Sequence, residues 1–538
     1  MIDILLRRLL TIFAYITELY ILYKNLQNPF RIKEKFARSC IYSHMKTKKP
    51  RHSLLYGTAL LFASNVLVKG LGFGYRVALV RLLGTEGVGL VEMITPIYSF
   101  LLVLAGLGLQ PALAQKVAAQ DEAAADASFG AAWRLLLISG LTVTAAGFVC
   151  SPLLAQGFAA DQRICPGLLA VLPAVFIVSL ASGWRGWFHG RRELGVLGMS
   201  QNVEQAVRVI LGLWLVKLLR PAGLARDAAG VSLATVGGEL AGYLYLALLG
   251  NWRRRGRRVR DGWHKAVRPL LAYGLPMTGG RLVNSLLLML QAFLIPYCLQ
   301  RGGCSVAAAT EIYGRFSGVA LTLLHLPGVF ASALATAVMP AAAANCSRPE
   351  TLRRYIARPL QAVLICTLPG MALLYLYAEP LCSGLFNNAQ AAPVLRLLAP
   401  GGIFFYMQMI LAGVLQGLGD VKQLLLNNAL SGCLLLVGVA LLVPLPGAGI
   451  NGAAIAMDLA WLCGFLLNLS ATSRHLSGSR ERGLPWDEIL RLPLAAFAAA
   501  TAVWCLCSSL TTVKAAALAA AAAAYLLIVF FNRGRISL

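Results

Sequence analysis

Charged residues are scarce in this chain. They make up 13% of the 538 residues, and hydrophobic residues make up 58%. A soluble domain carries about 25% charged residues. The mean hydropathy of the chain is +0.70. So little polar surface excludes a soluble globular protein and indicates an integral membrane protein with many spans.

Acidic residues are rarer still, with 22 Asp and Glu against 48 Lys and Arg. In a soluble chain, a net charge of +26 would suggest nucleic-acid binding. In a membrane protein, however, basic residues accumulate in the cytoplasmic loops. We therefore expect no nucleic-acid partner, and we expect the basic loops to contact anionic lipid headgroups.

Motifs of enzymes and metal sites are also missing from the sequence. The six histidines and twelve cysteines show no ligand spacing. Most of the cysteines lie in apolar runs, where free thiols behave as small hydrophobes. The sequence contains no P-loop, so ATP does not drive the chain directly. We predict that the protein is not an enzyme and binds neither a metal nor a cofactor.

Long apolar runs are abundant instead, and a run of about 20 residues can cross a bilayer as a helix. They predict an all-α integral membrane protein with fourteen transmembrane helices. The expected spans are 54–82, 87–113, 130–156, 165–187, 197–218, 228–250, 268–298, 311–343, 357–380, 391–416, 422–445, 450–470, 488–509 and 513–531.

Basic residues lie in alternate loops of this arrangement. The loop at 251–269 holds eight basic residues and one acid, whereas the loops at 380–391 and 444–451 are poor in Lys and Arg. This asymmetry predicts a multi-pass protein of the cytoplasmic membrane with both termini in the cytoplasm.

Residues 1–52 form a basic N-terminal extension with eleven Lys and Arg against three acids. Its apolar stretch at 9–23 is short for a span and lacks the small-residue cleavage site of a signal peptide. Two interpretations remain open. The stretch is an interfacial amphipathic helix, or the natural chain begins at Met45.

A glycine-containing corner occurs twice, as GWFHGRRELG at 186–195 and GVLQGLGDVK at 413–422. We expect its glycines to let the backbone turn. Further matches follow in the same order, at offsets of 221 and 225: ALAQKV at 112–117 with ALATAV at 333–338, and Thr85, Glu86 and Gly89 with Thr310, Glu311 and Gly314. These matches predict a duplicated unit of six helices.

The duplication predicts the domain organisation. Two parallel six-helix repeats occupy 53–250 and 268–472, and an even number of helices brings both into the membrane from the same side. The basic linker 251–267 joins them, and residues 473–538 add two transmembrane helices.

Several ionisable residues lie inside the expected spans, where each costs about 2.5–3.5 kcal/mol. At 1.5 Å per residue, Lys69 lies ~24 Å along the first span from Ser53, near the middle of the membrane. Arg76 follows seven residues later on the same helix face. With Arg281 and Arg315, these cations are candidates to line a cavity between the repeats. Snorkelling of Arg76 and headgroup contact of Arg281 and Arg315 are the alternatives.

The acids in the spans have other expected roles. Glu92 and Glu311 are candidate coupling or gating acids. Glu204 and Arg208 are four residues apart in the favourable order and predict a structural ion pair, whereas Glu239 has no visible partner. Gly70, Gly72 and Gly74, which follow Lys69, predict close packing of the first helix.

Several motifs, in order, resemble one family. They are KGLGFGYRVALVRLLGTEGVGL at 69–90, PIYSFLLVLAGLGLQPALAQKVA at 96–118, GWFHGRRELGVLGMSQNVEQAVRV at 186–209, IYGRFSGVALTLLHLPGVFASALATAVMP at 312–340 and GVLQGLGDVK at 413–422. The sequence resembles the stage V sporulation protein B family. This family belongs to the multidrug/oligosaccharidyl-lipid/polysaccharide exporter superfamily and is similar to the lipid II flippases.

The resemblance implies a V-shaped, alternating-access transporter of the bacterial cytoplasmic membrane that carries an undecaprenyl-pyrophosphate-linked sugar. In the related flippases, cations of helices one and eight line the cavity. Lys69 and Arg315 match such positions, and Arg76 matches another with a shift of one residue. The implied function is a flippase for lipid-linked oligosaccharide or peptidoglycan precursors, linked to sporulation or cell-wall synthesis and to the proteins of that synthesis.

Two other functions remain open at this point. The first is a multidrug or cation antiporter of the same superfamily, which needs an accessible acid such as Glu92, Glu204 or Asp458. The second is a membrane scaffold that organises wall-synthesis enzymes without transporting a substrate.

Overall fold

The computed structural model describes residues 51–153, 161–254, 263–346, 348–476, 484–510 and 514–531. The expectations for residues 1–50, including a start at Met45, and for most of the basic linker lie outside these residues. The chain divides into two compact units, Met1–Phe62 and Ala63–Leu538. All the contacts reported belong to the second unit.

Helical segments lie at all fourteen expected spans. The first two spans correspond to α3 (Arg51–Gly106) and α4 (Leu109–Ala119), and α3 is interrupted at Gly84, whose φ is 73°. Because a left-handed φ suits only glycine at low cost, Gly84 separates two helical segments. The next four spans correspond to α5 (Glu122–Leu153), α6 (Cys165–Gly190), α7 (Leu194–Leu219) and α8 (Leu224–Arg253).

The second series of helices begins with α9 (Trp263–Arg301) and continues with an interrupted eighth span. That span consists of α10 (Val306–Gly314), the π-helical turn η5 (Arg315–Leu321), α11 (Thr322–Leu324) and α12 (Gly328–Ala344). The remaining helices are α13 (Pro349–Leu376), α14 (Ala378–Phe386), α15 (Ala392–Gly417), α16 (Val421–Leu442), α17 (Gly449–Arg474), α18 (Trp486–Leu510) and α19 (Lys514–Phe531).

The surface and the helix lengths suit a membrane. Within the described residues, nine helical stretches are long and apolar enough to cross a bilayer, and one of them, Ala63–Ala119, contains the break at Gly84. Large apolar side chains such as Val149 and Leu248 are exposed by 73% and 71%. The protein is therefore an all-α, multi-pass integral membrane protein. The number of fourteen crossings stays a prediction.

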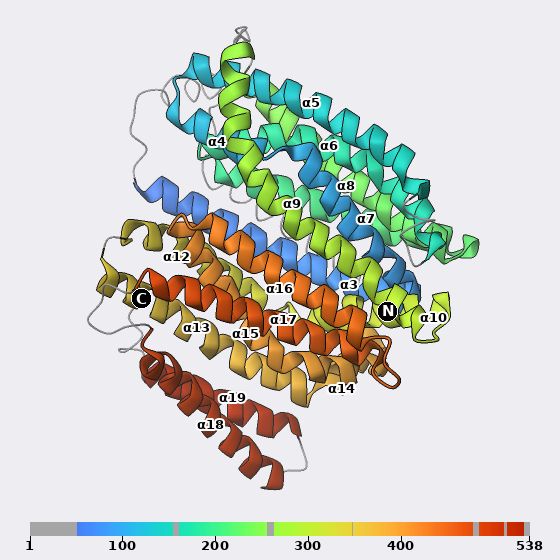
Figure 1. Cartoon of the computed structure of the whole chain (residues 1–538), viewed down its shortest axis with the longest axis vertical. Coiled ribbons are helices and arrows are strands. Elements are labelled where there is room, and N and C mark those ends of the chain that lie inside the picture. Colours follow the sequence, from blue (N-terminus) through green and yellow to red (C-terminus); the bar gives the residue numbers. More distant parts are fainter. Residues whose placement is uncertain are drawn as a thin grey trace, which may run out of the picture. The chain divides into compact units, whose positions relative to one another are not determined.

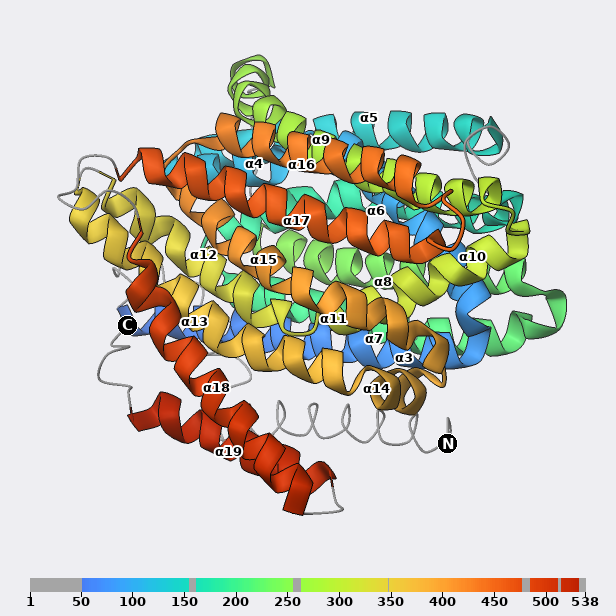
Figure 2. The same ribbon diagram turned by 60° about the horizontal axis from the view of Figure 1, so that its bottom comes forward.

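The helices pack in two groups (Figure 1). In the first group, α8 packs against α6 and α7, and α5 packs against α6. In the second group, α15 packs against α12, α13 and α17, and α16 packs against α17. Helix α9 contacts both groups, through α4 and α5 on one side and α16 and α17 on the other. Helices α18 and α19 pair with each other, and α18 packs against α13 (Figure 2).

The repeated corner has the same backbone in both copies. The residues that turn the chain are Arg192 and Gly419, with φ of 59° and 78°. They lie 227 positions apart, the offset that relates the two corners. In each copy the next amide donates back to a carbonyl five residues earlier, from Glu193 to Phe188 at 2.9 Å and from Asp420 to Leu415 at 3.0 Å. This is the Schellman ending of a helix.

The other glycines of the corner allow close packing, so the expectation that they turn the backbone is wrong. Gly186 and Gly190 lie inside α6, and a Cβ on either would come within 3.0 Å of a backbone carbonyl of α4. Gly413 and Gly417 lie inside α15, and each would meet a backbone carbonyl of α12 in the same way. The same helix crossing therefore occurs in both copies.

The repeated Thr-Glu-x-x-Gly segments face each other. A Cβ at Gly89 would collide with the backbone carbonyl of Thr310, and a Cβ at Gly314 would collide with that of Thr85. Two equivalent surfaces in contact give this reciprocal pattern. The second segment of α3 and α10 therefore cross at a distance that only glycine permits.

We expect the substitution G314A to lower the melting temperature of the detergent-solubilised protein by several degrees. The added methyl group would overlap the Thr85 carbonyl, and overpacking of this kind costs roughly 1–3 kcal/mol. The matched control is G74A, because a Cβ at Gly74 would meet nothing within 4 Å. Equal melting temperatures for G314A and the wild type would show that the helices do not cross this closely.

The two turn residues allow a second test, with effects of opposite sign. We expect G419A to destabilise the protein by about 1–2 kcal/mol, because a side chain strains a left-handed backbone. We expect R192G to be neutral or stabilising, because the Arg192 side chain is exposed and its backbone already carries that strain. Thermal unfolding measures both variants, and destabilisation by R192G as large as that by G419A would contradict the shared turn.

Candidate functional site

Lys69 lies in the first segment of α3 with an exposed side chain and without a hydrogen bond or ion pair to any described residue. A Cβ at Gly70 or Gly74 would meet nothing within 4 Å. The expectation of close packing is therefore wrong for these two glycines, whereas a Cβ at Gly72 would lie in ordinary contact with the Gln205 amide, at 3.6 Å. Lys69 is therefore an exposed cation without a partner among the described residues.

Arg76 lies seven residues further along α3 and is paired. Its guanidinium forms an ion pair with Glu92 in the second segment of α3. The other carboxylate oxygen of Glu92 accepts a hydrogen bond from the Ser317 hydroxyl at 2.6 Å. Ser317 belongs to the π-helical turn η5, a kind of element that is frequent at functional sites. Glu92, which is 9% exposed, thus connects α3 of the first repeat to η5 of the second repeat.

Arg315 begins the same π-helical turn and pairs with Glu311, one helical turn earlier. Glu311 also accepts a weak hydrogen bond from the Thr85 hydroxyl at 3.4 Å. Both side chains are half-buried. Each candidate acid, Glu92 or Glu311, is therefore paired with a candidate cation, which the sequence spacing alone did not show for Glu92.

Arg281 lies on α9 with an exposed side chain, and it has no ion-pair partner among the residues with known positions. No contact joins Arg281 to Lys69 in the described part of the chain. Its place in a shared cation site stays a prediction.

Glu204 and Arg208 belong to a larger ion network. Arg208 on α7 and Arg185 on α6 each contact both Glu204 and Glu239, with N–O distances of 2.6–3.3 Å. The four side chains are only 9–23% exposed. Two positive and two negative charges balance, so the network joins α6, α7 and α8 without a net buried charge. Sequence reasoning missed Arg185, although it is an ionisable residue inside an expected span.

A second network lies at the end of the unit near Gly84. Arg163 pairs with Asp161 and Glu86, both at 2.7 Å. The Thr310 hydroxyl donates a hydrogen bond to Asp161 at 2.8 Å. Burial alone would raise the Asp161 pKa, but the hydrogen bonds from Arg163 and Thr310 outweigh burial and hold this pKa below its ordinary value of 3.8. Asp161 is therefore a carboxylate at neutral pH and fixes the first helix group to α10.

Arg81 adds hydrogen bonds between helices at the same end of the unit. It donates hydrogen bonds to the backbone carbonyls of Gly384 and Leu385 in α14, at 2.5 and 2.7 Å. We call this region, formed by residues 81–89, 161–163, 306–314 and 384–388, the Gly84 end. At the two corners, each described pair of opposite charges joins residues of the same repeat. Arg253 pairs with Glu193 in the first repeat, and His475 pairs with Asp420 in the second. The ion pairs and polar contacts between groups are thus concentrated at the Gly84 end and at Glu92.

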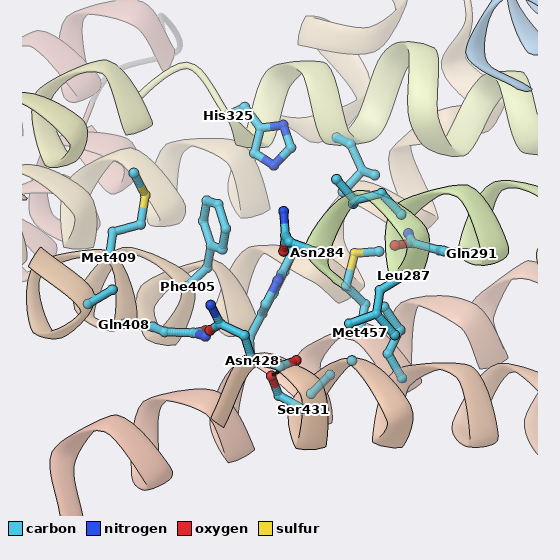
Figure 3. Close-up of a pocket in the computed structure, with 17 residues that line it drawn as sticks. Asn284, Leu287, Gln291, His325, Phe405, Gln408, Met409, Asn428, Ser431 and Met457 are labelled. Atoms are coloured by element: carbon cyan, nitrogen blue, oxygen red, sulfur yellow. Dashed lines mark hydrogen bonds between the residues drawn. The ribbon is translucent and has the colours of Figure 1, made fainter. Parts of the chain in front are cut away.

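His325 lines a pocket in the second helix group (Figure 3). The pocket has a volume of about 410 Å³ and lies between α9, α15, α16 and α17. Within the described residues, no cluster of His, Cys, Asp and Glu side chains could hold a metal ion. The site is thus one of cations and amides, suited to anionic and neutral polar groups.

Comparisons with known proteins agree with this architecture. Residues 54–345 match the family model for polysaccharide biosynthesis proteins, and residues 283–442 match a second model, MatE. The chain is 30% identical to stage V sporulation protein B of Bacillus subtilis strain 168 over 444 residues, which covers 79% of this chain and 85% of that protein.

Two further relatives are flippases by name. Lipid II flippase MurJ of the same bacterium is 21% identical over 475 residues and covers 82% of this chain, which in turn covers 86% of that protein. A solved structure of a lipid II flippase MurJ in an inward closed conformation superposes with a TM-score of 0.69 at 12% identity. The match covers 89% of this chain and all of that one. At this identity, the solved structure shows a shared fold.

The four-residue network predicts a large effect on stability for one substitution. We expect E239Q to lower the free energy of unfolding by about 3–5 kcal/mol, because it leaves Arg185 and Arg208 with a single acid between them. The double variant E239Q/R185Q restores the charge balance, so it should recover part of that loss. Thermal unfolding of the three proteins in detergent is the measurement. Wild-type stability of E239Q would show that the network is not formed.

Proposed function

We propose that this chain, which belongs to the polysaccharide biosynthesis protein family, is a flippase for a lipid-linked sugar pyrophosphate. Members of the family are transporters of the multidrug/oligosaccharidyl-lipid/polysaccharide exporter superfamily and not enzymes. The cargo would be an undecaprenyl-pyrophosphate-linked precursor of a cell-wall polymer. The similarity to a sporulation protein and to a lipid II flippase supports this choice of cargo and a role in sporulation or wall synthesis.

The observation that carries the proposal is the free charge of Lys69. An unpaired ammonium inside a membrane helix is costly unless it faces water or an anion. Other ionisable residues around it, such as Arg76 and Glu92, have partners. A pyrophosphate supplies the missing counter-charge, and charge-assisted hydrogen bonds to its oxygens offset the cost of removing the ammonium from water.

The paired cations supply a switch in this proposal. A pyrophosphate beside Lys69 competes with Glu92 for Arg76 and with Glu311 for Arg315. Because Glu92 also accepts a hydrogen bond from Ser317, a change at Arg76 reaches the contact between the helix groups. Glu92 and Glu311 therefore act as gating acids, and Arg281 adds positive charge from α9.

The distribution of charge orients the transporter. The basic corner loops face the cytoplasm by the positive-inside rule, so the Gly84 end faces outward. The described state is fastened at that outward end by the contacts of Asp161 and Arg81, and the cargo enters from the cytoplasm. Rocking of 53–250 against 268–472 then opens the Gly84 end and closes the corner end, as alternating access requires.

A cation-coupled multidrug antiporter is the second candidate, and the match of residues 283–442 to the MatE model favours it. This activity needs an acid that can bind and release a cation. Glu92 and Glu204 are held in ion pairs. Asp458 has a buried oxygen without a hydrogen-bond partner, so it is the acid that this alternative would use.

The proposal predicts a transport defect in K69A. In vesicles reconstituted with the purified protein and a polyprenyl-pyrophosphate disaccharide, we expect K69A to reduce translocation about tenfold or more, because a hydrogen bond to a charged group contributes about 1.5–3 kcal/mol. We expect K69R to keep most of the activity because it keeps the charge. The matched control is K217A, which removes an exposed lysine near the end of α7 that has no partner among the described residues.

The same vesicles separate the rival functions. Translocation by K69A at the wild-type rate would remove Lys69 from the mechanism. Cation-dependent dye efflux that is lost in D458N, without lipid translocation, would identify the antiporter. Full biological function of a chain that lacks every cavity charge would identify the scaffold.

A further inference from the structure

The pocket beside His325 is lined by apolar side chains, amides and aromatic rings rather than by charges. Four of its lining side chains are carboxamides, namely Asn284 and Gln291 on α9, Gln408 on α15 and Asn428 on α16. Its lining contains no Asp, Glu, Lys or Arg. In Figure 3, Asn284, Gln408 and Asn428 surround the same space as the Phe405 ring. Such a lining suits an uncharged polar ligand.

The four amides have unused hydrogen-bonding capacity. None of their side chains forms a hydrogen bond with any residue whose position is described. An adjacent amide behaves differently: Asn427 donates to Asn468 at 2.8 Å and accepts from Gln423 at 2.9 Å. An amide without a partner is costly in an apolar surrounding. The Asn427 amide thus makes its hydrogen bonds inside the protein. The four amides that line the pocket can instead bind a ligand or water.

The aromatic rings supply a second kind of contact. The Phe405 ring centroid lies 5.1 Å from that of Trp461 and 5.4 Å from that of His325. Together these rings form an apolar wall next to groups that can both donate and accept hydrogen bonds. A sugar ring has the matching surfaces, because its C–H faces are apolar and its hydroxyl and acetamido groups both donate and accept.

The position of the pocket connects it to the cation site. Leu321 and His325 line the pocket. Leu321 ends the π-helical turn η5, whose Ser317 donates a hydrogen bond to Glu92, the partner of Arg76. The volume of about 410 Å³ falls within the range of about 300–1,000 Å³ that is usual for small-ligand pockets. The pocket thus begins at the element that contacts the Arg76–Glu92 pair, and it has the size of a small-ligand site.

We infer that this pocket is the sugar subsite of the transporter. It binds the neutral sugar rings next to the pyrophosphate through Gln408 and Asn428, while Phe405 and Trp461 pack against the ring faces. This inference rests on the proposed function. It adds that the second helix group recognises the sugar, whereas the cations recognise the pyrophosphate.

The test compares two cargoes in reconstituted vesicles, polyprenyl pyrophosphate with a disaccharide and the same lipid pyrophosphate without a sugar. We expect the double variant Q408A/N428A to move the sugar-linked lipid about tenfold more slowly, since each lost hydrogen bond contributes about 0.5–1.5 kcal/mol. We expect no change for the sugar-free lipid. K69A should slow both cargoes. The matched control is Q416A, an exposed amide eight residues further along α15.

Three results would overturn the subsite. They are an unchanged rate for the sugar-linked lipid in Q408A/N428A, an equal loss for both cargoes, and an equal loss in Q416A. If the wild type moves neither cargo, the proposed function fails by itself. Thermal-shift binding of the two lipids then decides the subsite: an extra stabilisation by the disaccharide that disappears in Q408A/N428A supports it, and one that persists contradicts it.

Discussion

A charge in the hydrocarbon layer must have a partner, and this constraint organises the structure. Arg185 and Arg208 share two acids, Arg76 has Glu92, and Arg315 has Glu311. These pairs hold helices together without exposing net charge to lipid. Lys69 and Arg281 depart from the pattern, since neither has an ion-pair partner among the described residues. Lys69 also lies next to glycines that border open space. A carrier for an anionic headgroup needs such a cation, and a purely structural helix does not.

The duplicated architecture places this cation where a carrier can use it. Equivalent glycines bring α6 onto α4 and α15 onto α12, and the segments that begin at Thr85 and Thr310 meet reciprocally. Ion pairs at the Gly84 end then fasten one group to the other. Rigid groups whose described polar contacts are concentrated at one end, with α9 packed against both groups, form an arrangement that can rock. Short polar contacts at that end can break and re-form at low cost because their groups can also bind water.

Much of the fold could be predicted from the sequence, because apolar runs and repeat offsets are local or periodic signals. Each expected span contains a helix, and the equal backbone of Arg192 and Gly419 follows from the 227-residue offset. The partners in the candidate site could not be predicted in this way. Glu92 reaches Arg76 and Ser317 across 16 and 225 positions, and such contacts depend on how each helix is rotated. The pocket amides stayed unnoticed since single Asn and Gln residues in apolar helices resemble packing residues until their neighbours are known.

The central claim is that Lys69 faces an aqueous chamber that is accessible from the cytoplasm and binds a pyrophosphate. A membrane-impermeant amine-reactive reagent, applied to either face of sealed vesicles and followed by peptide mass spectrometry, tests this claim on the native chain. The account predicts that Lys69 is modified only from the cytoplasmic face and that a polyprenyl pyrophosphate protects it. Lack of modification from both faces, or equal modification with and without that lipid, would contradict it.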